Sequence, residues 1–166
     1  MKIHDDHLYH GAALTQIAEH KQFTAINAFK LKVGASRSAF VINDEIGVYL
    51  KYATKPMPAY KEYPFTFRSE HLEELASISK KCKSVFAALV CVKDRQICCL
   101  SYEELLQLVE KRKRSRGSNE DQYTVLATLP ENKSFRVYVS PAGAKKSILG
   151  SPIIISRRAF PDRIFE

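Results

Sequence analysis

The pattern of apolar and polar residues along this chain predicts helices and strands in mixed order. Apolar residues at helical spacing predict an amphipathic helix over about residues 7 to 20. Alternation over residues 28 to 33, with every second residue apolar and lysines between, predicts a half-buried strand. Residues 38 to 53 then read as a hairpin, because two β-rich apolar runs flank the turn Asn43-Asp44-Glu45.

The middle of the chain predicts a helix, two strands and a second helix. Residues 69 to 83 combine an acidic first turn with a basic last turn, as the helix dipole favours. Val85 to Val92 is an unbroken apolar run, typical of a strand buried on both faces of a sheet. A strand at 97 to 100 leads into the capping box Ser101-Tyr102-Glu103-Glu104, which opens a short helix through about Glu110.

Two segments predict irregular chain. Residues 54 to 67 hold three prolines and so are not regular throughout, and residues 111 to 122 predict an exposed, charged loop. Three further strands are expected at 123 to 129, 134 to 139 and 153 to 156.

This order of elements predicts an α/β fold with a mixed central sheet flanked by helices. With 166 residues, we expect a single domain over residues 1–166. Its core covers about residues 7–110, followed by the basic loop at about 111–122 and the C-terminal strands at about 123–166.

The net charge narrows the classes of partner. The chain has 26 Lys and Arg against 18 Asp and Glu, a formal charge of +8. Such a balance favours polyanions, so we expect nucleic acid, DNA or RNA, as the partner, although a chain from a basic proteome shows the same imbalance. The first ten residues are polar and acidic, and no apolar run approaches the ~20 residues of a membrane span. We therefore expect a cytoplasmic protein with no membrane partner.

Several kinds of site lose support from the sequence. The four cysteines show no CxxC spacing, which disfavours zinc or redox chemistry. The chain contains no GxGxxG or GK[ST] phosphate-binding loop, no GxSxG turn and no HExxH helix, which disfavours nucleotide-binding enzymes and the corresponding hydrolases.

Lys51 is the most informative single residue, because it interrupts an otherwise apolar strand. A lysine in such a strand is costly unless its ammonium reaches solvent or an anion. The order of helix, strand, hairpin with an in-strand lysine, helix and apolar strand resembles the PD-(D/E)xK superfamily, the restriction-endonuclease-like fold, over about residues 7 to 100. In that family, carboxylates hold one or two divalent cations against a phosphodiester and a lysine helps to stabilise the developing charge.

The resemblance implies a metal-dependent nuclease with named residues. Lys51 is then the catalytic lysine, Asp44 the nearest candidate for the metal-binding aspartate, Glu45 a second metal ligand and Glu19 the accessory helix acid, with Mg²⁺ or another divalent cation as cofactor.

The sequence departs from the family's pattern at the acids. Tyr49 stands where acid-x-lysine needs its carboxylate, and Ser38 and Ala39 stand where the first-strand aspartate is expected. The alternative is a non-catalytic binding or scaffold module on the same fold, such as an adaptor between proteins. The structural explanation of Lys51 is that it lies on an edge strand, where its ammonium reaches solvent and discourages pairing with another strand.

Basic residues form two candidate nucleic-acid contacts. Lys55 and Lys61 lie among tyrosines in the proline-rich segment, an arrangement that suits stacked bases between bound phosphates. The other candidate is the run Lys111, Arg112, Lys113, Arg114 and Arg116, which we expect to bind phosphates without sequence preference. Arg157, Arg158 and Arg163 are candidates to extend that second patch.

Overall fold

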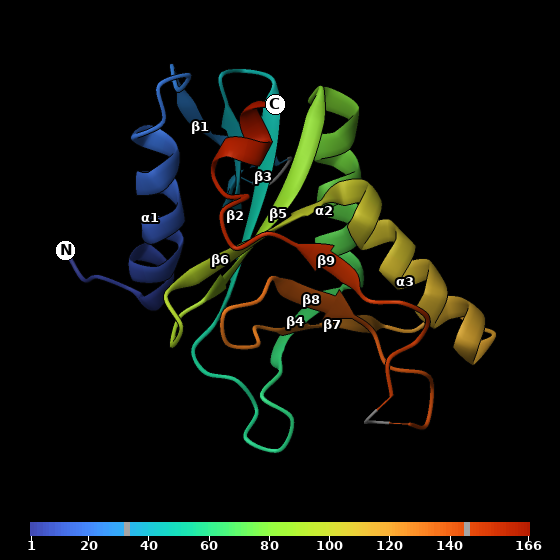
Figure 1. Cartoon of the computed structure of the whole chain (residues 1–166). Helices are drawn as coiled ribbons and strands as arrows, with labels where there is room; N and C mark the ends of the chain where they lie inside the picture. Colours follow the sequence, from blue (N-terminus) through green and yellow to red (C-terminus); the bar gives the residue numbers. More distant parts are fainter. Residues whose placement is uncertain (32–33, 145–146) are drawn as a thin grey trace.

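The protein is described here by a computed structural model covering residues 1–31, 34–144 and 147–166 (Figure 1). In chain order its elements are α1 (Asp5–Ala18), β1 (Ile26–Leu31), β2 (Gly34–Ile42), β3 (Ile46–Ala53), β4 (Tyr63–Arg68), α2 (Ser69–Lys81), β5 (Ser84–Cys91), β6 (Gln96–Ser101), α3 (Tyr102–Arg116), β7 (Gln122–Thr128), β8 (Phe135–Tyr138), β9 (Ile153–Ile155) and the 3-10 helix η1 (Asp162–Phe165). Among these residues, no helix combines the length and the apolar character needed to cross a membrane.

The predicted mixed sheet is present and has five strands, in the order β1-β2-β3-β5-β6. Strands β1, β2 and β3 form an antiparallel meander, β5 runs parallel to β3, and β6 returns antiparallel to β5. Parallel neighbours require a crossover connection, which β4 and α2 supply between β3 and β5. Helix α1 lies on one side of this sheet and α2 and α3 on the other, so the expected α/β fold is confirmed (Figure 1).

A second sheet holds the C-terminal strands. Strands β7, β8 and β9 lie close to their predicted positions, but they pair with β4 in the antiparallel order β4-β7-β8-β9. The end of the proline-rich segment is therefore a strand, which its composition does not predict. Pro64 is accommodated because β4 is at the edge of its sheet, where a missing N–H donor is tolerated.

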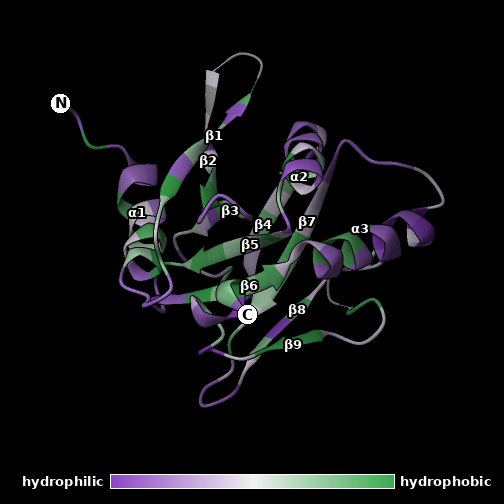
Figure 2. Ribbon diagram, turned by 90° about the horizontal axis from the view of Figure 1, so that it is seen from above, coloured by the Kyte–Doolittle hydropathy of each residue, from purple (hydrophilic) through white to green (hydrophobic). Residues whose placement is uncertain are grey.

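Two apolar layers cover the two faces of the central sheet. On one face Ala87 and Leu89 belong to a large cluster that also includes side chains of the second sheet, α2 and α3. On the other face Ala88 and Val90 pack with α1 and with the C-terminal residue Ile164. The apolar run of β5 is thus buried on both faces, as its sequence predicts, and Figure 2 shows the corresponding hydrophobic colouring along the central strands.

Helix α3 is longer than its sequence pattern predicts. It begins at the predicted capping box, where Glu104 N–H donates to Ser101 Oγ over 3.1 Å and Ser101 N–H to Glu104 Oε1 over 2.9 Å. The expected loop at 111–122 is wrong in its first half, because the helix continues to Arg116 and ends at Gly117. Lysine and arginine are good helix formers, and Gly117 adopts the left-handed conformation (φ 81°) that ends many helices.

Candidate functional site

Lys51 lies in the middle of the central sheet. Strand β3 is the third of five strands, so the explanation of Lys51 as an edge-strand lysine is wrong. The Lys51 ammonium lies 3.1 Å from Nδ1 of His71 and 5.0 Å from the ring centroid of Phe67. Burial, reinforced by the charge of Arg68, lowers the pKa of Lys51 from its ordinary value of 10.5 to about 8.

The hydrogen bonds around His71 fix where its proton resides. His71 Nδ1 accepts the backbone N–H of Arg68 over 3.1 Å at the start of α2, so this nitrogen carries no proton. The Lys51 ammonium is therefore the donor in its contact with the same nitrogen. The ring proton is then on Nε2, which lies 4.0 Å from Oε1 of Glu70. Burial and the neighbouring Lys51 charge lower the pKa of His71, in keeping with a neutral ring.

Tyr49 shares the sheet face of Lys51, because residues two apart along a strand point to the same side. Its side chain is only 2% exposed, and its hydroxyl donates to Oε2 of Glu74 over 3.0 Å. Burial, with the Glu74 carboxylate, raises the pKa of Tyr49. The position at which the resemblance calls for an acid thus holds a neutral phenol bonded to a carboxylate from α2.

His71 and Glu74 are the neighbours of Lys51 that the sequence did not single out. They are three residues apart, so they occupy one face of α2. That spacing was available as a signal, but only the pairing of β3 with β5 shows that this face of α2 covers Lys51.

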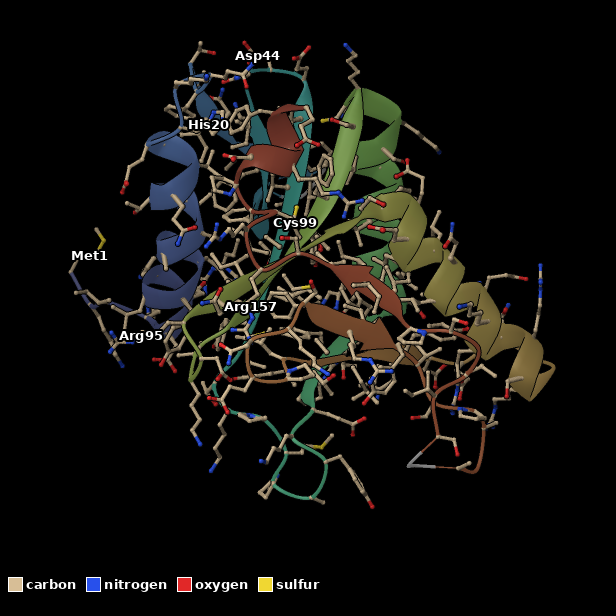
Figure 3. The ribbon with its side chains drawn as sticks, viewed as in Figure 1. Met1, His20, Asp44, Arg95, Cys99 and Arg157 are labelled. Carbon is tan, nitrogen blue, oxygen red and sulfur yellow. The ribbon has the colours of Figure 1, made fainter. Side chains whose placement is uncertain are left out.

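The predicted acids lie elsewhere. Asp44 and Glu45 are exposed in the turn before β3, and Glu19 is exposed at the end of α1. Seven residues separate Asp44 from Lys51 along the strand, a separation of roughly 20 Å at ~3.3 Å per residue. Figure 3 shows Asp44 at the tip of the hairpin. The structure therefore does not bring Asp44, Glu45 or Glu19 together with Lys51.

The hairpin turn is held in place by Asn43. Its side-chain oxygen accepts the backbone N–H of Thr24 over 2.7 Å, and its amide group donates to the Gln22 carbonyl over 2.7 Å. These bonds tie the turn to the chain that follows α1, which places Glu19 near this end of the sheet. The three acids thus gather at the end opposite to Lys51.

A hollow of about 640 Å³ adjoins Lys51 between the start of α1, the start of β2 and the strands β3 and β4. Ser38, one of the two positions where an aspartate is expected, lines it together with His10. His10 is 7% exposed, and its Nδ1 is buried without a hydrogen-bond partner among the described residues. Burial lowers the pKa of His10.

The donor set does not fit the divalent cation that the resemblance implies. Within residues 1–31, 34–144 and 147–166, no three His, Cys, Asp or Glu side chains are arranged to hold one ion. The two predicted metal ligands, Asp44 and Glu45, lie in an exposed turn far from Lys51 along β3. Asp44 and Glu45 therefore do not form one site with Lys51.

The basic run of α3 is divided among several contacts. Arg112 donates through Nε and Nη2 to both carboxylate oxygens of Glu120, over 2.9 and 3.0 Å, and through Nη1 to the Ser140 carbonyl over 2.8 Å. Lys111 donates to the Ser151 carbonyl over 3.3 Å. Arg112 thus joins α3 to the chain around it, and its charge is already matched by a carboxylate.

The other members of this run are more open. Lys113 lies over the ring of Tyr123 at 5.7 Å, while Arg114 and Arg116 are exposed and form ion pairs with Glu110 and Glu120. The last turns of α3 appear as a hydrophilic, purple end in Figure 2. Arg112, Arg114 and Arg116 are paired with carboxylates, and Lys113 lies over an aromatic ring. This end of α3 is therefore a weaker anion-binding site than its sequence predicts.

Lys55 and Lys61 meet cations that the sequence does not place near them. Together with Lys93 and Arg157 they line a hollow of about 670 Å³, which we call the basic cleft. Its carboxylates are Asp94 and Glu131, and its apolar side includes Met57. Figure 3 shows Arg157 far below the hairpin turn that carries Asp44.

Two hydrogen bonds hold Arg157 between this cleft and a second hollow. Its Nε donates to the Lys133 carbonyl and its Nη2 to the Pro130 carbonyl, each over 2.6 Å. It also lines an adjoining hollow of about 340 Å³ with Lys133 and Arg158. Arg157 and Arg158 therefore extend the basic cleft and not the α3 run. Arg163 extends neither, since it donates to the Glu104 carboxylate and the Cys99 carbonyl, each over 2.8 Å.

Most aromatic residues of the proline-rich segment are core residues. Tyr63 and Phe65 are each 1% exposed, and the Tyr63 hydroxyl donates to Asp94. Tyr60 is 41% exposed. Tyr63 and Phe65 are therefore not stacking platforms, and the large exposed side chains of this segment are those of Lys55, Met57, Tyr60 and Lys61.

Comparisons with family models, with curated proteins and with solved structures returned no match to this chain.

Proposed function

We propose that this chain binds nucleic acid and does not cleave it, as a non-catalytic module on an α/β fold. The observation that carries the proposal is the basic cleft. Lysines from the loop after β3 and the turn after β5 converge there with Arg157 from the chain after β9. Cations from three separate segments that converge on one hollow are typical of phosphate-binding surfaces.

The charge of the basic cleft is available to a ligand. Lys55, Lys61 and Lys93 are exposed, and the Nε and Nη2 groups of Arg157 donate to neutral carbonyls. Within the described part of the chain, no ion pair of 4.0 Å or less involves any of these four cations. The run on α3 differs, because carboxylates neutralise several of its members.

The surroundings of Lys51 argue against cleavage. Its hydrogen-bond partner is a neutral imidazole, and the acid position two residues earlier is a phenol. Hydrolysis of a phosphodiester by this family's chemistry needs carboxylates at the scissile phosphate. Between β3 and α2 the chain forms β4, a strand that the order of elements behind the resemblance does not contain.

The decisive experiment combines binding and cleavage on labelled single- and double-stranded DNA and RNA, with Mg²⁺, with Mn²⁺ and with EDTA. We expect binding that weakens with salt, with a slope of about −0.7 to −0.9 per phosphate contacted, and no cleavage under any condition. Changing Lys55→Glu together with Lys61→Glu is expected to weaken binding and reduce the slope. The matched control, Lys80→Glu with Lys83→Glu, makes the same charge change at exposed positions at the other end of the molecule.

A parallel variant, Lys113→Glu with Arg114→Glu, measures the contribution of α3. If this variant binds more weakly while the basic-cleft variant binds as tightly as the unmodified protein, the interface lies on α3. That result would overturn the assignment to the cleft.

A metal-dependent nuclease is the second candidate, and Glu74 is the observation in its favour. This carboxylate lies on the Lys51 side of the sheet, where its charge raises the pKa of Lys51 against the larger effect of burial. Cleavage that needs a divalent cation, and that is lost in folded Lys51→Ala and Glu74→Gln proteins, would establish this candidate and refute the non-catalytic proposal.

A further inference from the structure

The shape of the basic cleft points to a particular form of nucleic acid. Its volume of about 670 Å³ lies within the range of about 300–1,000 Å³ typical of pockets that enclose small ligands. A surface that binds only the backbone of a duplex needs cations but no hollow of this size. The cleft therefore has room for a base that projects from the sugar–phosphate backbone.

Part of the lining of the cleft is apolar. Pro56, Met57 and Pro58 contribute to it from the loop after β3, and Leu129 and Pro130 from the loop after β7. Met57 is 40% exposed, so its side chain is open to a ligand. Inside a duplex the bases are stacked and paired, and these walls would meet only sugars and phosphates. The flat face of an unpaired base, in contrast, gains by leaving water against such a wall.

The cations of the cleft are placed to contact the phosphates on either side of an unpaired base. Lys55 and Lys93 lie on the side of the β3 and β5 ends, and Arg157 lies between this cleft and the adjoining hollow of Lys133 and Arg158. Arg157 is fixed by its two carbonyl partners, so little conformational entropy is lost when it binds a phosphate.

The cleft also holds acceptors that a base can use. Asp94 and Glu131 line it, and carboxylates accept hydrogen bonds from the exocyclic amino groups of bases. Asp94 is oriented by Tyr63, whose hydroxyl donates to its carboxylate and accepts its backbone N–H over 3.1 Å.

We propose that the basic cleft binds one unpaired nucleotide of a single strand, with its base against Met57 and the flanking phosphates on the lysines and on Arg157. This inference rests on the proposed nucleic-acid binding and adds the class of substrate. A strand that continues past Arg157 reaches the hollow formed with Lys133 and Arg158.

The test measures binding by fluorescence anisotropy to four labelled probes of equal length. These are single-stranded DNA, single-stranded RNA of the same sequence, a blunt DNA duplex, and a DNA strand made of abasic sites. We expect at least one of the two single strands to bind about tenfold or more tightly than the duplex and the abasic strand, on the scale of one lost base contact.

Two variants separate the base contact from the charge. Met57→Ser is expected to reduce single-strand affinity to the level of the duplex and to leave the salt slope unchanged, because no charge is removed. Its matched control is Leu106→Ser, at an equally exposed apolar residue of α3 (41% exposed), which is expected to change nothing. Lys55→Glu with Lys93→Glu is expected to weaken binding to every probe and to reduce the salt slope.

The outcomes distinguish this inference from the function on which it rests. Equal, salt-dependent binding to all four probes, unchanged in Met57→Ser, would overturn the unpaired-nucleotide site while nucleic-acid binding stands. Absence of salt-dependent binding to any probe would overturn both.

Discussion

Replacing Lys51 by methionine tests whether the buried ammonium is a burden on the fold. Methionine has a similar length and no charge, so it can fill the same space against Phe67. Lys51 has a pKa lowered from 10.5 to about 8, mainly by burial, so the folded state disfavours its protonated form. We expect Lys51→Met to be close in stability to the unmodified protein at pH 7 and to compare less favourably with it as the pH rises.

The size of the penalty on the charged lysine follows from the pKa. One pKa unit corresponds to about 1.4 kcal/mol, which sets an upper bound of about 3 kcal/mol for the penalty on the charged lysine. Solvent reaches part of the side chain and screens its charge, which reduces the penalty to about 1–2 kcal/mol. The methionine variant also loses the contact of the ammonium with the ring of Phe67 and its hydrogen bond to His71, together worth about 1–2 kcal/mol. At pH 7 the penalty and these contacts are therefore expected to offset each other to within about 1 kcal/mol.

The difference in stability between the two proteins must depend on pH in a defined direction. Below pH 8 both the folded and the unfolded chain hold the Lys51 proton, so the penalty is complete. Between pH 8 and 10.5 the folded chain releases this proton while the unfolded chain keeps it, so the stability contributed by Lys51 rises with pH. The stability of the methionine variant relative to the unmodified protein is therefore expected to fall through this window.

Urea unfolding at pH 7, 8, 9 and 10 measures the difference in the free energy of unfolding between the two proteins, with the m-value as a check on compactness. Groups common to both proteins cancel in this difference. Lys55→Met, at an exposed lysine, is the matched control and should give a difference that does not vary with pH. A difference that is the same at every pH, or that moves in favour of Lys51→Met as the pH rises, would refute the reasoning.

Three further substitutions test contacts that position the site. Tyr49→Phe removes the hydroxyl that donates to Glu74 and is expected to lower the free energy of unfolding by about 1–2 kcal/mol, measured by urea unfolding. Gly47→Ala places a methyl group against Ile78 Cγ2, where α2 crosses β3, and is expected to cost about 1–3 kcal/mol in the same assay. Arg112→Ala removes paired hydrogen bonds to a carboxylate and is expected to cost about 1–3 kcal/mol while leaving nucleic-acid affinity unchanged in an anisotropy titration.

Each of these three expectations has a result that contradicts it. A Tyr49→Phe protein of full stability would show that the Glu74 contact contributes nothing in solution. A Gly47→Ala protein of full stability would place α2 farther from β3 than the structure does. Arg114→Ala is the exposed control for Arg112→Ala, and equal losses in the two variants would contradict the structural role assigned to Arg112.

Local features of the fold were predictable because they depend on residues close together in sequence. The Ser101 capping box spans four residues and needs no distant partner. The apolar run of β5 requires cover on both faces wherever it lies. The length of α3 was missed because a run of charges resembles a loop in composition, although lysine and arginine are good helix formers and Gly117 supplies a stop.

The candidate site was predictable only in part, because its members come from distant segments. Lys51 stands out in sequence, yet the assumption that the nearest acids along the chain would join it failed. Asp44 precedes β3 and Lys51 lies near the other end of that strand, so most of the strand's length separates them. Helix α2, in contrast, places Glu74 beside Tyr49, although the two residues are 25 positions apart in the sequence. Lys55 and Lys61 were identifiable from sequence, whereas Arg157 joins them only through the pairing of β9 with β8.

The sequence alone determined the class of fold and an excess of positive charge that favours polyanions. It also showed that a lysine lies in an apolar strand, where burying its charge costs free energy. Those properties follow from periodicity and composition, which act locally or over the whole chain. The tertiary structure decided that Lys51 faces a neutral histidine and a tyrosine in place of an acid pair, and that the cations with available charge gather around the basic cleft. Packing decides such matters, because strand order and helix crossovers determine which distant side chains share a face.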